Sequence, residues 1–416
     1  MRPQIIKAAA APAALEVLIH CRRTAAVAKL IDHQLLLPSE EKDLLHAACL
    51  QHHSDKAVPA PKGMQRLLRD ILGAELSAPI SSVRAVLNAY EVPGSGLPLE
   101  SRLAGILRLA DAFDQGMEAQ PIDGEDVDEL LEQLRSGVDG GLWPERVLDA
   151  LVEATRPGPM SDAESWRVPV FPQAALLMLS LMRDPMVSVA QVVSATSLDP
   201  ATAGLVMQLS NSAMFASRTR MSTLPQAINR LGFETVQKVV TSVALRSVFC
   251  SPKRQGAWKH SLQVADLAEQ LAHRAGVVDP AEAYLAGLIH DVGRIALLSV
   301  PLYDSARLLG LESGGCPPVY AENLLLRTDH AALGAQIATG WSLPERMVSA
   351  IRQHHRPEDT KNPLAYLLYV AEHLSGSQED LPSLLRLGTS LKGLGLEWDN
   401  VGDCNVSALG VWLAAA

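Results

Sequence analysis

Residues 281–298 read AEAYLAGLIHDVGRIALL and place an adjacent histidine and aspartate, His290 and Asp291, at the end of an apolar run. Positions spaced i, i+3, i+4 and i+7 lie on one face of a helix, and here they are Ala283, Ala286, Gly287 and His290. His290 is therefore predicted on the buried face. A single buried histidine is more often a hydrogen-bonded core residue than a ligand, so the pair His290-Asp291 alone does not indicate a metal site.

Later and earlier stretches also place histidines, and one acid, on or beside apolar helical stripes. His260, for example, shares the stripe of residues 258–272 (WKHSLQVADLAEQLA) with Val264 and Leu267. The candidate metal ligands are His260, His290, Asp291, His330, His354, His355 and Glu372. Imidazole and carboxylate groups that face inward from separate helices suit divalent iron, manganese, zinc or nickel. The alternative is a metal-free core in which these histidines hydrogen-bond one another and Asp291.

The composition predicts an all-α protein. The chain has 416 residues, of which 48% are hydrophobic and only 4% aromatic, and helical periodicity recurs throughout. Alanine and leucine dominate, which favours helices packed through small and branched aliphatic side chains. We therefore expect two helical lobes, each built as a bundle.

The charge and the cysteines limit the partners and the compartment. The net charge is −10 and the pI is about 5.7, which argues against non-specific binding to nucleic acid or to an anionic membrane. No apolar stretch is long enough to span a bilayer, and the apolar run near residue 8 lacks a convincing cleavage site. The 5 scattered cysteines contain no C-x-x-C pair, so we expect a reduced, cytoplasmic protein.

Proline and polar residues mark one domain boundary. The segment RPGPMSDAESWRVPVFP begins at Arg156 and has the composition of a linker. The predicted organisation is a helical domain at 1–155, a linker at 156–168, a second domain at 169–400 and a tail at 401–416. Within the second domain, residues 169–250 form a first helical subdomain and residues 251–400 a second one.

The second domain resembles a known family. The order His, His-Asp, His, His-His and acid is similar to the HD phosphohydrolase superfamily. Residues 169–250 add Asp199-Pro200, Asn211-Ser212-Ala213-x-Phe215 and Ala227-Ile228-x-x-Leu231-Gly232, which resemble the signature of the HDOD branch. The superfamily resemblance implies that the seven candidate ligands hold metal, which would activate water on a phosphodiester. Glu372 and Arg294 stand where the superfamily has an aspartate and a lysine.

The first domain resembles an HD-GYP domain that has lost its chemistry. His20 matches the first histidine of that family, and Asp111 keeps its final acid. His53 stands in place of the metal-binding aspartate, and Ala89-Tyr90 in place of the histidine pair. The resemblance therefore implies a metal-free lobe with a structural or docking role, since catalytic metals need three or more protein ligands.

Two functions follow from these resemblances. The HDOD family implies a non-catalytic regulatory protein of bacterial signal transduction, an adaptor or sensor that acts by binding other signalling proteins, with a small nucleotide as a further ligand. The alternative is a metal-dependent phosphodiesterase acting on a cyclic dinucleotide or another nucleotide. No residue is predicted as catalytic, and binding to nucleic acid or membrane is not expected.

Overall fold

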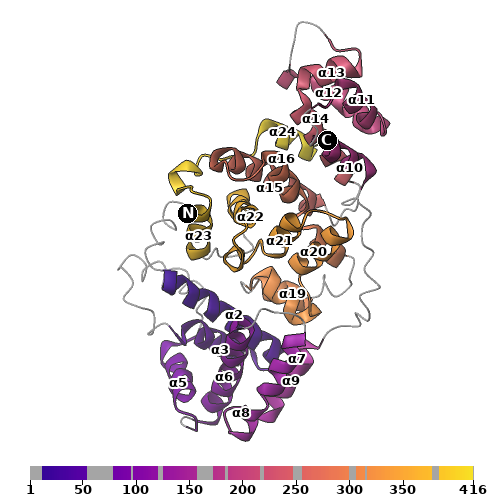
Figure 1. The fold of residues 1–416 in the computed structure, drawn as a ribbon. Helices are drawn as coiled ribbons and strands as arrows, with labels where there is room; N and C mark the ends of the chain where they lie inside the picture. Colours follow the sequence, from indigo (N-terminus) through magenta and orange to yellow (C-terminus); the bar gives the residue numbers. More distant parts are fainter. Residues whose placement is uncertain are drawn as a thin grey trace. The chain divides into compact units, whose positions relative to one another are not determined.

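The structure is a computed structural model of the whole chain (Figure 1). It describes residues 12–53, 78–94, 97–119, 125–156, 172–182, 186–215, 220–246, 255–298, 306–313, 316–376 and 384–415. Within these ranges every regular element is a helix, and no strand occurs. The predicted all-α fold is thus confirmed. The predicted linker lies outside the described residues, apart from Arg156.

The chain divides into two compact units. The first contains residues 1–165, 300–329 and 378–386, and the second contains residues 166–299, 330–377 and 387–416. Residues 300–329 therefore group with the N-terminal helices, whereas the sequence analysis placed them within the second domain. The physical reason is packing: the apolar helix at 306–313 lies against α2 (Pro12–Leu35) of the first unit.

The first unit is a bundle around α2. This helix packs on α3, α6 and α9, which bury a continuous set of alanine, leucine and valine side chains. The elements of this unit are α2 (Pro12–Leu35), α3 (Ser39–Gln51), α5 (Ile80–Glu91), α6 (Pro98–Ala119), α7 (Glu125–Gln133), α8 (Ser136–Asp139), α9 (Glu145–Thr155), α18 (Ala306–Ser313) and α19 (Pro318–Leu326).

The second unit begins with five short helices, α10 (Gln173–Met182), α11 (Val189–Thr196), α12 (Pro200–Ser210), α13 (Leu224–Leu231) and α14 (Phe233–Arg246). Asp199 caps α12, as the Asp-Pro pattern predicts: its carboxylate accepts hydrogen bonds from the amides of Ala201 and Thr202, both at 3.1 Å. The similar pair at 184–185 lies outside the described residues.

Asn211 is a structural residue of this subdomain. Its side-chain amide donates to the carbonyls of Met207 and Met221, each at 3.0 Å, and its oxygen accepts from the Met221 amide at 2.8 Å. Asn211 thus ties the end of α12 to the segment before α13. These are the hydrogen bonds of a helix cap.

Asn211→Ala should lower the free energy of unfolding by about 1–2 kcal/mol, because two exposed contacts to Met221 are lost. Urea unfolding measures this change. Ser194→Ala is the matched control, since the Ser194 hydroxyl bonds only to a carbonyl of its own helix, and its effect should stay within about 0.5 kcal/mol. Equal stability of the two variants would contradict the capping role.

The rest of the second unit is a bundle around α15 (Gln255–Ala275), which packs against α16, α22 and α24. The further elements are α16 (Pro280–Ile289), α17 (Val292–Leu297), α20 (His330–Gly340), α21 (Glu345–Arg352), α22 (Pro363–Ser375) and α24 (Ala408–Ala415). Helix α23 (Leu384–Gly393) has residues in both units. Among the helices described, none is long and apolar enough to cross a membrane.

The segment predicted as a tail is partly ordered. Residues 408–415 form α24, and the buried Asp266 on α15 holds the start of that helix. The Asp266 carboxylate accepts hydrogen bonds from the Ser407 amide at 2.5 Å and from its hydroxyl at 2.6 Å. A carboxylate at a helix N-terminus satisfies free amide groups and the helix dipole, which explains why the segment docks there.

Candidate metal centre

All seven predicted ligands come together in the second unit. His260 lies on α15, His290 follows α16, and Asp291 precedes α17. His330 begins α20, the adjacent histidines of residues 354–355 follow α21, and Glu372 lies on α22. Their ligand atoms form overlapping groups, each with all atoms within 4.8 Å of one another: His260, His290 and Glu372; His290, Asp291 and His354; His330, His354 and His355.

Asp291 is the centre of this arrangement. Asp291 is 2% exposed. Its Oδ1 atom lies 3.3 Å from His330 Nε2 and 3.6 Å from His290 Nε2. Oδ1 is also 3.8 Å from His354 Nε2, and Oδ2 is 3.8 Å from His260 Nε2. A divalent ion with ligands at about 2.0–2.2 Å separates them by roughly 3–3.5 Å, so the spacing is close to that of a metal site.

Two histidines are oriented by the ends of their own helices. The Nδ1 atom of His290 donates to the carbonyl of Gly287 at 2.8 Å, and that of His354 donates to Ile351 at 2.6 Å. In a neutral ring this hydrogen bond leaves a lone pair on Nε2. Both Nε2 atoms, and Oδ1 of Asp291, are buried without a hydrogen-bond partner among the described residues. Lone pairs that face a carboxylate need a cation between them.

The electrostatics support neutral imidazoles around an ionised carboxylate. Burial lowers the pKa of His290 and of His354, and neighbouring histidines lower that of His354 further. Burial alone would raise the pKa of Asp291, but His290, His330 and Arg294 bring it well below its ordinary value. Because metals bind neutral histidine and ionised aspartate, the directions of these pKa shifts at His290, His354 and Asp291 favour metal binding.

One side of the cluster is more accessible than the other. The side chain of His260 is 17% accessible, and those of His355 and Glu372 are 13% and 16% accessible. His355 also contacts His330, with 2.8 Å between their Nε2 atoms, and lies 3.8 Å from the Glu372 carboxylate. The seven residues therefore fit one or two divalent ions, with Asp291 between the groups on either side.

The sequence analysis missed the close helix contact that positions His330. A Cβ atom at Gly293 would lie 2.0 Å from the His330 carbonyl oxygen and 2.5 Å from the Gly334 amide nitrogen. Only glycine lets α17 approach α20 this closely. The signal in the sequence was a glycine two residues after the His-Asp pair.

The second half of the chain matches a known protein family. Residues 168–357 match the family model of the HDOD domain. This part of the chain is therefore an HDOD domain, as the sequence motifs indicate. The match does not include residues 1–155, where the likeness to HD-GYP domains stays a prediction.

Curated proteins and solved structures give weaker likenesses. The chain is 27% identical over 202 residues to an uncharacterized protein of Treponema pallidum, covering 47% of this chain and 39% of that protein. It is 25% identical over 181 residues to a ribonuclease Y of Geobacter metallireducens, covering 41% of this chain and 30% of that protein. The match thus spans less than half the length of either relative.

Among solved structures, an HDOD domain protein of unknown function from Geobacter sulfurreducens aligns with a TM-score of 0.46 and 23% identity, covering 59% of this chain and 87% of that chain.

Proposed function

We propose that this chain is a regulatory protein of bacterial signal transduction whose HDOD domain binds a divalent metal ion. The observation that carries the proposal is the pair of oriented, buried Nε2 atoms of His290 and His354, which face the Asp291 carboxylate without hydrogen bonds. The chemistry of the donor set favours iron, manganese, zinc or nickel over magnesium or calcium, which prefer oxygen ligands.

Burial of the central ligands favours a regulatory over a catalytic role. His290, Asp291 and His354 lie in the core, and the imidazole rings crowd one another, with 4.1 Å between the centroids of His354 and His355. Closed sites are typical of structural metals, whereas catalytic metals keep an open position. A metal here would link α15, α20 and α22, and so couple ligand binding to the shape of the domain.

The partners in this proposal are other signalling proteins in the cytoplasm. The net charge of −10 favours partners with basic surface patches. A nucleotide is the small ligand that we propose for modulating this binding.

A metal-dependent phosphodiesterase is the second candidate function. It is favoured by the accessible side of the cluster, where His260, His355 and Glu372 could leave a coordination position for water. Because of the partial similarity to ribonuclease Y, RNA is a third candidate substrate to assay, besides cyclic dinucleotides and other nucleotides.

Metal analysis combined with activity assays tests the proposal. Full-length protein, purified without a histidine tag or chelator, should contain about one or two equivalents of a transition metal more than the Asp291→Ala variant. It should show no turnover of cyclic di-GMP, simple nucleotides or RNA with manganese, iron or nickel supplied. Turnover that disappears in His290→Ala would favour the enzyme, and protein without metal would contradict both candidates.

A further inference from the structure

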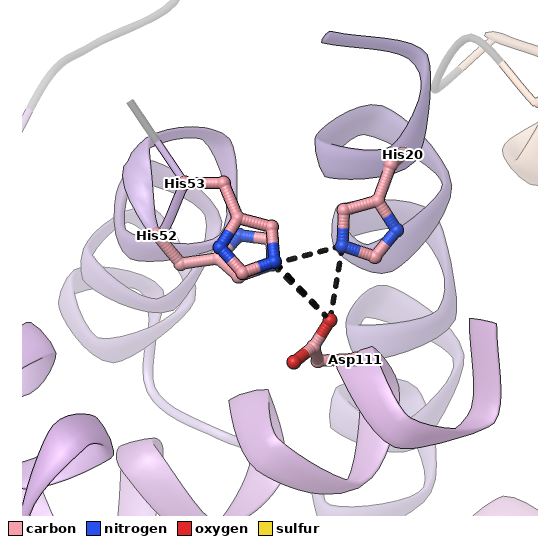
Figure 2. Close-up of side chains that lie close together, drawn as sticks. All are labelled: His20, His52, His53 and Asp111. Atoms are coloured by element: carbon pink, nitrogen blue, oxygen red, sulfur yellow. Dashed lines mark hydrogen bonds and ion pairs between the residues drawn. The ribbon is translucent and has the colours of Figure 1, made fainter. Parts of the chain in front are cut away.

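A second histidine and aspartate cluster lies in the first unit. Figure 2 shows His20, His52, His53 and Asp111 pointing toward one another from three segments of the bundle. His20 lies on α2, His52 and His53 follow α3, and Asp111 lies on α6. Their four ligand atoms all lie within 4.8 Å of one another. We propose that these four residues bind one divalent transition-metal ion.

The spacing of the ligand atoms fits a single ion. His20 Nε2 lies 2.9 Å from Asp111 Oδ1 and 3.2 Å from His52 Nε2. Oδ1 of Asp111 is 3.4 Å from His52 Nε2 and 3.9 Å from His53 Nε2. A tetrahedral ion with ligands at about 2.0–2.1 Å separates them by roughly 3.3 Å, which lies within this range. Three imidazoles and one carboxylate suit zinc, iron, cobalt or nickel.

The rings of His20 and His52 are already oriented for such an ion. The Nδ1 atom of His52 donates to the Cys49 carbonyl at 2.6 Å, the same contact to the third preceding residue that His290 and His354 make. The Nδ1 atom of His20 lies 2.6 Å from the Asp114 carboxylate. Both Nε2 atoms therefore aim at Asp111, as in the carboxylate–histidine–metal arrangement of known sites.

An outer layer of contacts fixes the two aspartates. Asp114 is fully buried and accepts two hydrogen bonds from Arg23, at 2.8 and 3.1 Å. Oδ2 of Asp111 accepts from the Tyr90 hydroxyl at 2.6 Å, and Oδ1 accepts from Gln115 at 2.8 Å. Tyr90 occupies a position where the sequence analysis counted a lost ligand. In the structure it orients the remaining carboxylate instead.

A proton is the competing occupant of this cluster. Without metal, burial opposes charge on His20, but hydrogen bonds to Asp111 and Asp114 outweigh it and raise its pKa to about 9. One proton on His20 Nε2 then serves both Asp111 and His52. A divalent ion would replace this proton and satisfy all the ligands together.

Cobalt titration of the full-length Asp291→Ala variant tests the proposal, because that variant lacks the centre of the other cluster. It should bind about one equivalent of Co²⁺, with visible absorption bands of a four-coordinate ion. Adding Asp111→Ala should weaken binding at least about 100-fold, since even outer contacts contribute 10–100-fold. Tyr90→Phe should weaken it by about 10-fold.

Asp43→Ala is the matched control, since it removes an exposed aspartate from α3 of the same unit and should leave Co²⁺ binding unchanged. His53→Ala removes the outermost ligand, and it replaces Asp111→Ala as the test of Co²⁺ binding if Asp111→Ala fails to fold. A folded Asp291→Ala protein that binds no Co²⁺ would overturn the proposal. The difference in bound Co²⁺ between the wild type and Asp291→Ala measures metal binding at the HDOD cluster separately.

Discussion

Asp291→Ala is expected to remove the metal of the HDOD cluster entirely. Among the carboxylates that the structure describes, Asp291 is the one with an ion-pair distance of less than 4 Å to four different histidines, His260, His290, His330 and His354. Alanine would leave neutral imidazoles facing one another without the charge that holds a cation. The affinity should fall by at least about 100-fold, since loss of outer contacts already costs 10–100-fold. Metal content by mass spectrometry, normalised to protein, measures the effect.

Asp266→Ala is the matched control for this experiment. Asp266 is also a buried aspartate of the HDOD lobe, but its carboxylate binds Ser407 and the start of α24. The control should lose stability and keep its metal. If Asp291→Ala kept as much metal as the wild type while circular dichroism showed a folded protein, the HDOD cluster would not be the site of that metal. If neither protein contained metal, the hydrogen-bonded core would be the better description of the cluster.

Gly293→Ala is expected to destabilise the HDOD domain by about 3 kcal/mol or more, because overpacking against backbone atoms cannot be relieved by side-chain rotation. The added methyl group would overlap the His330 carbonyl and the Gly334 amide. Helices α17 and α20 would have to separate, and His330 would move away from Asp291. We therefore expect weaker metal binding as well. Urea unfolding and metal titration measure the two effects.

Gly204→Ala provides the control for the glycine substitution. Gly204 lies on the exposed side of α12, and nothing lies within 4 Å of the added Cβ. Alanine there should stabilise the helix by about 1 kcal/mol through its higher helix propensity. A Gly293→Ala protein with wild-type stability would show that α17 and α20 do not approach as closely as the structure has them.

The sequence alone determined what depends on local interactions. Helical periodicity established the fold class, and the Asp199-Pro200 pair located the start of α12, because capping involves residues within one turn. The seven residues of the HDOD cluster could be named because each lies on or beside an apolar stripe that must face a core. Burial of polar groups on such a stripe requires partners, which is why inward-facing histidines and acids were expected to meet.

Only the tertiary structure decided how these groups meet. The sequence could not show that His290 and His354 turn their Nε2 atoms toward Asp291, because backbone carbonyls at helix ends set that orientation. Nor could it show the contact of Gly293 with α20, which joins residues far apart in the chain.

In the first unit, matching motif positions one by one predicted a lobe without metal, which stays a prediction; it did not show that His53 and Tyr90 lie beside Asp111 in space. Ligand geometry depends on which atoms converge across helices. That convergence is a property of packing, which linear spacing within each segment does not specify.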